Sequence, residues 1–212
     1  MLGSAGKLEV VDRFCYLGDM LSARGGCELA CRTRAKCAWG KFMELLPLLA
    51  RRGVSLKIKG KIYGACVQSV LLYGSQTWGM RVVDLQILER TERMMVRWMC
   101  GVTLRDRRSS AELLDLLSVV GVGDMVRRGR LRWFEHVERN MHARANDWFS
   151  KCRFLEVDGK RRAGRSRKTW GECVQDDMKQ VGLKPEDVSN RGLWRAGILG
   201  NRLTRTRVEN RR

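Results

Sequence analysis

Proline and histidine are both scarce in this sequence. Only Pro47 and Pro185 occur among 212 residues, and because proline breaks helices, its scarcity permits long uninterrupted ones. The two histidines, His136 and His142, have no serine or cysteine partner in a motif that would indicate a nucleophile–base pair. The sequence therefore favours a mainly helical protein, and it predicts no catalytic residues.

Cysteine makes up 8 of the 212 residues, too few for a secreted disulfide scaffold. The N-terminus has no apolar signal core, and most cysteines fall at apolar helical positions. Cys27, Cys31 and Cys37 lack a nearby cysteine or histidine pair at the spacing of a zinc site. We expect reduced core thiols, no metal, no cofactor and an intracellular location, nuclear or cytoplasmic, rather than secretion.

Long hydrophobic runs are also missing. The longest uncharged stretch, residues 62–80, is interrupted by glycine, glutamine, serine and threonine too often to lie in hydrocarbon. The sequence thus predicts no membrane-spanning segment and no membrane partner.

Acidic residues are few beside the basic ones. The chain has 23 Asp and Glu against 42 Lys and Arg, a net charge of +19, and 31 of the cations are arginine. Guanidinium presents a planar fork of donors that matches phosphate, so this bias favours nucleic acid as the partner. Of the net charge, +14 lies between residues 51 and 168. With 44% hydrophobic residues, the chain can still bury a core.

Helical periodicity dominates after the first stretch of the chain. Residues 8–21 are rich in β-branched and aromatic types and predict one or two short strands. Apolar residues then recur at helical spacing, and each run is bounded by capping or glycine signals. The expected helices cover 27–46, weakening or ending just before Pro47; 55–73, with Leu56, Ile62, Cys66 and Val70 inward; 84–100, burying Leu85, Leu88, Met95 and Trp98; a segment after the Ser109–Glu112 capping box; 124–139; 169–181; and a last one around 193–198. Residues 151–158 could form a further strand.

The expected fold class is therefore mainly α: a helical bundle-like region and a basic helical C-terminal region, with a short β segment at the N-terminus. The predicted division is 1–24 for the strand segment, 25–104 for the helical bundle, 105–200 for the basic region with an arginine-rich loop at 160–168, and 201–212 for a basic tail.

The loop at 160–168 is the sharpest candidate site, because six of its nine residues are basic and would repel one another unless a polyanion neutralised them. An ordinary solvated loop or a nuclear-localisation signal is the alternative. A second candidate is the arginine-rich face of the 124–139 helix beside Trp133 and Phe134, although core packing suits those two aromatics better. The candidate phosphate contacts in these two places are Lys160, Arg161, Arg162, Arg165, Arg167, Lys168, Arg127, Arg128, Arg130 and Arg132.

Asp176 and Asp177 invite comparison with the aromatic-x-Asp-Asp turn that holds catalytic metals in polymerases. Their segment starts with Val174 and lies inside a capped amphipathic helix, so the sequence favours two ordinary helical carboxylates.

Several segments together resemble the reverse transcriptases of non-LTR (LINE-type) retrotransposons. Phe14–Gly18 resembles the segment just after the catalytic palm, and Val70–Trp78 resembles the family's LLYGSETW signature. Leu131–Val137 is similar to LRWFGHV, Gly164–Trp170 to GRPRKTW, and Asn190–Arg195 to the closing DR..WR. The order is that of the family over about residues 8–203. Gln76, Glu135 and Ser166 depart from these signatures.

The resemblance implies roles for the parts of this chain. Phe14, Tyr16, Leu17 and Gly18 would correspond to a primer-grip hairpin, and the helices of about 27–100 to the thumb that holds template–primer duplex. Lys57, Lys59 and Lys61 would suit phosphate contact there, with a solvated helix face as the alternative. The family's aromatic-x-Asp-Asp turn precedes the Tyr-Leu-Gly segment, and we expect this chain to lack it.

The functional expectation is a reverse-transcriptase remnant of a mobile element, not itself an enzyme, that binds RNA, DNA or both by the backbone. The partner would be a template–primer-like duplex or the element's own RNA. The alternatives are a basic helical module that binds a protein or localises to the nucleus without a nucleic-acid role, an active polymerase or nuclease, and a remnant with no selected function.

Overall fold

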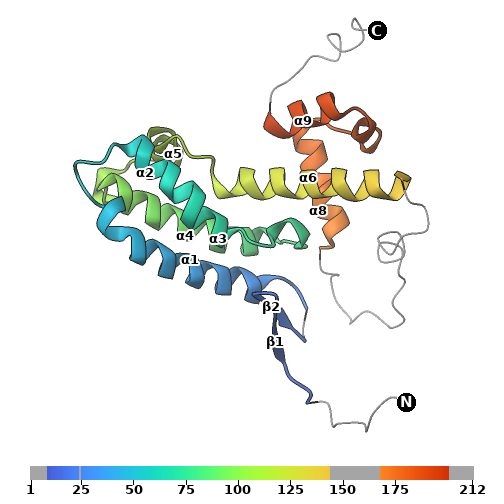
Figure 1. The fold of residues 1–212 in the computed structure, drawn as a ribbon, viewed down its shortest axis with the longest axis horizontal. Helices are drawn as coiled ribbons and strands as arrows, with labels where there is room; N and C mark the ends of the chain where they lie inside the picture. The colour runs from blue at the N-terminus through green and yellow to red at the C-terminus, as the bar shows by residue number, and fades with distance from the viewer. Residues whose placement is uncertain (1–8, 24, 144–167, 201–212) are drawn as a thin grey trace, which may run out of the picture.

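A computed structural model describes residues 9–23, 25–143 and 168–200. This part of the chain is mainly helical and carries one small antiparallel hairpin at its N-terminal end (Figure 1). The predicted fold class is confirmed. The possible strand at 151–158 and most of the arginine-rich loop lie outside the described residues.

The N-terminal hairpin consists of β1 (Arg13–Tyr16) and β2 (Asp19–Ser22). Phe14 pairs with Leu21 and Tyr16 with Asp19. Leu17 and Gly18 form the two-residue turn with φ of 48° and 76°, the conformation that matches the twist of hairpin strands and favours glycine. Every residue of β1 is exposed, so β2 is the strand that attaches the hairpin to the helices.

α1 (Glu28–Leu49) continues through Pro47, where the sequence predicted that the helix would weaken or end. Proline removes one backbone N–H, yet Leu49 beyond it is fully buried, and the packing of that side chain keeps the last turn in place. Of the two predicted outcomes, an end before Pro47 is therefore excluded, because the helix ends at Leu49.

The second helical segment is divided into α2 (Leu56–Ile62), the π-helix η1 (Tyr63–Gln68) and α3 (Ser69–Leu71). Ser55 caps it, as predicted, by accepting a hydrogen bond from the Ile58 N–H. Of the four predicted inward residues, Leu56, Ile62 and Val70 are partly buried and pack against the core, and Cys66 is partly exposed. The fully buried apolar positions are Tyr63, Val67 and Leu71, which the sequence did not predict. Two of these three positions lie in the π-helix, whose hydrogen bonds span five residues instead of four.

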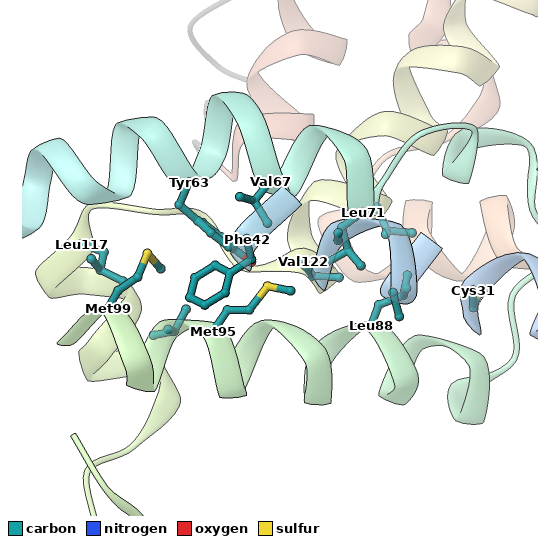
Figure 2. Close-up of a cluster of buried hydrophobic side chains, with 14 of the residues drawn as sticks. Cys31, Phe42, Tyr63, Val67, Leu71, Leu88, Met95, Met99, Leu117 and Val122 are labelled. Carbon is teal, nitrogen blue, oxygen red and sulfur yellow. The ribbon is translucent and has the colours of Figure 1, made fainter. Parts of the chain in front are cut away.

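A short 3-10 turn, η2 (Ser75–Thr77), leads to α4 (Val82–Cys100), which ends at Gly101 in the left-handed conformation, as predicted. α4 buries Leu88 and Met95 against α1 and the α2–α3 segment (Figure 2). Trp98, in contrast, is 50% exposed, and it packs edge-on against Trp39 and Phe42. The prediction that Trp98 is a core residue is wrong.

After η3 (Leu104–Asp106), the predicted Ser109–Glu112 capping box opens α5 (Ser110–Leu117). The long helix α6 (Val122–Ala143) then runs from this first core to a second group of helices (Figure 1). The remaining elements are α8 (Trp170–Val181), η4 (Pro185–Ser189) and α9 (Arg191–Leu199).

The second core gathers around Trp194, which is fully buried and donates from its indole to the Leu131 carbonyl. Phe134 packs on it at 5.8 Å between ring centroids, which confirms its core role. The two cores meet at residues 76–80. Trp170 Nε1 donates to the Gln76 carbonyl at 2.8 Å, and Cys173 Sγ donates to the Met80 carbonyl.

Candidate nucleic-acid interface

The lysines of α2 fall into two environments. Lys57 and Lys61 are exposed, and no carboxylate of the described residues forms an ion pair with either. Lys59 is only 4% exposed, and its Nζ donates to the Met99 carbonyl at 3.1 Å, beneath the C-terminal end of α4. Lys59 therefore does not suit the phosphate contact predicted for it, because its charge already satisfies a helix end inside the protein.

Exposed residues continue from these lysines at every fourth position. Lys57, Lys61, Ala65, Ser69 and Tyr73 are all exposed, and we call them the lysine–tyrosine stripe. The wider turn of η1 keeps positions four apart more nearly in line than a regular α-helix would. Two cations, two small residues and one aromatic ring thus follow one outer face from α2 to the end of α3.

The inner side of the same π-helix meets a buried carboxylate. Tyr63 Oη and Gln68 Nε2 both donate to Glu92 Oε1, at 3.4 and 3.0 Å, and the Val122 N–H donates to Oε2 at 2.8 Å. Because Tyr63 and Gln68 are five residues apart, the i→i+5 geometry of η1 brings both to one acceptor. Burial raises the pKa of Glu92 to about 7, against the hydrogen bonds from Val122, Gln68 and Tyr63 that lower it.

Tyr73, at the end of the stripe, rests on a buried arginine. The guanidinium carbon of Arg34 lies 4.3 Å from the centroid of the Tyr73 ring, within cation–π range. Arg34 is 8% exposed, and its Nε and Nη2 atoms are buried without a hydrogen-bond partner. A Cβ at Gly18 would lie 3.4 Å from Nη2, so the hairpin turn closes over the guanidinium on another side.

The hairpin and the turn after α3, which carry two of the sequence signatures, are therefore neighbours. Asp19 Oδ2 accepts a hydrogen bond from Trp78 Nε1 at 3.0 Å, which ties β2 to this turn. The residues that the sequence assigned to a primer-grip-like hairpin, Phe14, Tyr16, Leu17 and Gly18, are all exposed, and the first two rings stack at 6.5 Å. Whether they contact a primer stays a prediction.

The four arginines predicted on α6 have different surroundings. Arg132 is exposed and Arg128 half-exposed, and neither has an acidic partner among the described residues. Arg127 is held by Asp124 at 2.6 Å and by Gln180. Arg130 is 5% exposed and forms an ion pair with Asp177 at 2.8 Å, so it does not suit the phosphate contact predicted for it. The pair joins α6 to α8 inside the protein.

In the 160–168 loop, the structure describes Lys168 alone, and its Nζ pairs with Asp176 Oδ2 at 2.6 Å. The other predicted contacts of the loop, Lys160, Arg161, Arg162, Arg165 and Arg167, lie outside the described residues. Asp176 and Asp177 both lie within α8 and both pair with cations, as expected of ordinary helical carboxylates.

A cleft of about 610 Å³ opens where α1 begins, beside the turn after η2. Its cations already have partners: Arg32 pairs with Glu28, and Arg81 with Glu28 and Asp84. Cys27 donates to Asp84 Oδ2 at its edge. In the described residues no three His, Cys, Asp or Glu side chains gather as a metal site would require, and no helix is long and apolar enough to cross a membrane.

Three arrangements were not predicted from the sequence: the Glu92 cluster, the Arg34–Tyr73 contact and the Arg130–Asp177 pair. Gln68 and Glu92 fall at spacings compatible with a helix interior, but periodicity alone does not reveal a π-helix. The Arg34–Tyr73 contact joins residues 39 positions apart, and no local pattern marks it.

Comparison with known proteins gives one informative similarity. Over 179 residues the chain is 24% identical to a protein of Caenorhabditis elegans whose name describes it as transposon-derived and uncharacterized. The match covers 82% of this chain and 63% of that protein, so the chain spans less than two thirds of its relative's length. No family model matches the chain, and no solved structure matches it.

Proposed function

We propose that this chain derives from a mobile element and holds nucleic acid by its phosphate backbone, without strong sequence specificity. The observation that carries the proposal is a set of cations on α2 and α6 without acidic partners among the described residues: Lys57, Lys61, Arg128 and Arg132. Cations left without a protein partner are available to replace the counterions of a polyanion. The net charge of +19 and the similarity to a transposon-derived protein both support this function.

The more specific form of the proposal is a reverse-transcriptase origin. It rests on the ordered signatures in the sequence, and in it the α1–α4 bundle plays the part of a thumb beside the hairpin. The chain would then hold template and primer for an RNA-directed DNA polymerase, while the catalytic carboxylates come from elsewhere in the parent protein.

Salt dependence of binding tests the proposal directly. Fluorescence anisotropy with labelled duplex DNA, an RNA–DNA hybrid and single-stranded RNA should show an affinity that falls steeply with salt. About six phosphate contacts would give a log–log slope of roughly −4 to −5. An affinity unchanged between low and moderate salt would overturn the proposal.

Matched double variants locate the contacts. Lys57→Gln with Lys61→Gln should make the slope on duplex less steep by about 1.8, because two phosphate contacts are lost. Arg32→Gln with Lys41→Gln removes the same charge from residues already engaged with Glu28 and Glu44 and should change the slope less. Equal effects of the two double variants would indicate that net charge, and not this face, governs binding.

A second candidate is a module that binds an acidic protein partner. It is favoured by the exposed side chains of Met94 and Trp98, which lie one turn apart on α4, where Trp98 contacts Trp39 of α1. Exposed apolar residues beside cations suit such a partner. A bound protein that single-stranded RNA and duplex DNA both fail to displace would support this reading.

A further inference from the structure

We propose that Tyr73 is a stacking site for an unpaired nucleobase, held in place by the buried cation of Arg34. This inference rests on the proposed nucleic-acid function and makes it more specific, because stacking on one ring selects single-stranded or frayed nucleotides over intact duplex. Three features of Tyr73 support this site: the exposure of the ring, the cation beneath it and its position on the lysine–tyrosine stripe.

Exposure separates Tyr73 from the two other aromatic rings between residues 63 and 78. Tyr63 is fully buried and Trp78 is 5% exposed, with its Nε1 engaged by Asp19, whereas Tyr73 is 56% exposed. The Tyr73 ring is thus neither buried in the core nor stacked on another aromatic ring of the described residues. An aromatic face left to solvent can accept a base of any sequence, since every base has a π-face.

Support from below distinguishes Tyr73 from an incidental surface ring. One face of the ring lies on the Arg34 guanidinium, 4.3 Å from its carbon atom. Two nitrogens of that guanidinium are buried without a hydrogen-bond partner, and no carboxylate of the described residues pairs with it. The Arg34 charge therefore remains uncompensated directly behind the ring, where it favours negative charge nearby and fixes the ring's orientation.

Position supplies the rest of a nucleotide site. Lys57 and Lys61 lead along the lysine–tyrosine stripe to Tyr73, and only the small side chains of Ala65 and Ser69 intervene. A strand whose phosphates contact the lysines could thus approach the helix closely and reach the ring with its last base. The cations would supply affinity that depends on salt, and the ring would supply affinity that depends on a base.

The test compares Tyr73→Ala and Tyr73→Phe with the wild-type chain on a short labelled single strand. Loss of one stacked base costs about 1–3 kcal/mol, so the alanine variant should bind roughly 5- to 150-fold more weakly, and the phenylalanine variant nearly as tightly as wild type. The salt slope should stay unchanged, because no charge is removed. Thr77→Ala, which loses only a hydrogen bond to the Gly74 carbonyl in the same turn, is the control.

An abasic strand of the same length completes a thermodynamic cycle. On it, wild type and Tyr73→Ala should bind alike, because no base remains to stack, and on a blunt duplex the two should also differ little. If Tyr73→Ala binds the normal strand as tightly as wild type, or loses as much on the abasic strand, the stacking site is wrong. If instead wild type shows no salt-dependent binding to any strand, the proposed function itself fails.

Discussion

Glu92 is the residue on which three parts of the first core converge. Its carboxylate accepts hydrogen bonds from Tyr63 and Gln68 of η1 and from the first residue of α6, Val122. Gln68 also donates to the Val120 carbonyl, so the same cluster fixes the connection between α5 and α6. A buried carboxyl with several donors is stable only while every partner is present. This one determines how α6 leaves the first core.

The elevated pKa of Glu92 predicts a measurable dependence of stability on pH. A carboxyl with a pKa of about 7 in the folded chain, against an ordinary value of 4.5, binds its proton more tightly when folded. Its contribution to the free energy of unfolding is therefore fully present below pH 4.5 and is lost as the pH rises through about 7. The loss amounts to at most about 3 kcal/mol.

Urea denaturation of wild type and Glu92→Gln at pH 5 and pH 8 isolates this contribution. Glutamine does not titrate, so the stability of wild type relative to the variant should be greater at pH 5 than at pH 8. Other carboxylates cancel in the comparison. The same difference at both pH values would mean that Glu92 does not hold its proton near neutrality.

Asp177, like Glu92, is a buried carboxylate that accepts a hydrogen bond, but its donor is a cation, Arg130. The pair therefore takes that cation out of the surface that a ligand could reach. Burial raises the pKa of Asp177 in spite of the adjacent guanidinium, and the pair is almost inaccessible to a ligand. Arg132, two residues along, is exposed. The helix thus divides its cations between the α6–α8 contact and solvent, and only the solvent-facing ones can meet a phosphate.

At the scale of elements, the boundaries of the helices were largely predictable, and the faces were less so. Ser109 and Thr169 form the capping boxes expected of them, and Gly101 and Gly182 end their helices with positive φ. These signals are local, because a cap satisfies the backbone groups next to it. Which side of a helix is buried depends on partners that are distant in the sequence. The π-helix at Tyr63–Gln68, for example, places Gln68 so that it donates a hydrogen bond to Glu92 of α4.

The same difference between local and distant contacts decides which parts of the candidate site can be predicted from the sequence. The exposure of Lys57 and Lys61 agrees with the helix that the sequence predicts over 55–73. The burial of Lys59 could not be predicted, because spacing alone does not show which face of α2 meets Met99. Tyr73 lies in the segment Val70–Trp78, but its contact with Arg34 forms only in the folded chain.

The contact of α2 with α5 predicts that Gly60 cannot be replaced. A Cβ at Gly60 would lie 1.9 Å from the Leu117 carbonyl oxygen, a backbone atom that can move only with its helix. Gly60→Ala should therefore destabilise the protein by about 1–3 kcal/mol or more. Gly40→Ala in α1 meets nothing within 4 Å and should be neutral or stabilise by up to about 1 kcal/mol. Thermal unfolding of the two variants compares them; similar melting temperatures would contradict the packing.

At the scale of the whole molecule, the two cores are joined by the continuous helix α6, which contributes to both, and by a contact between residues 76–80 and the start of α8. The start of α8 reaches back across some 90 residues of sequence to donate to the Gln76 and Met80 carbonyls. Lys168, the last residue of the arginine-rich loop, is therefore anchored beside the first core.

Gly79 makes this junction possible and provides the test of it. A Cβ there would lie 3.0 Å from the Lys168 carbonyl oxygen and 3.2 Å from the Trp170 nitrogen, both backbone atoms. Gly79→Ala should thus push the start of α8 away from the first core and weaken both hydrogen bonds that join them. Hydrogen exchange should become faster for the amides of α8 and change little for those in the middle of α4.

Gly171→Ala is the matched control, because a Cβ at Gly171 meets nothing within 4 Å and alanine favours the helix. Its α8 amides should exchange as slowly as in wild type, or more slowly. If the α8 amides of Gly79→Ala exchange as slowly as those of wild type, the backbone around Gly79 accommodates the added methyl group. The arrangement of the two cores then does not depend on this close approach. If α4 loses protection to the same extent as α8, the two cores unfold as one cooperative unit, and the junction holds the entire described chain together.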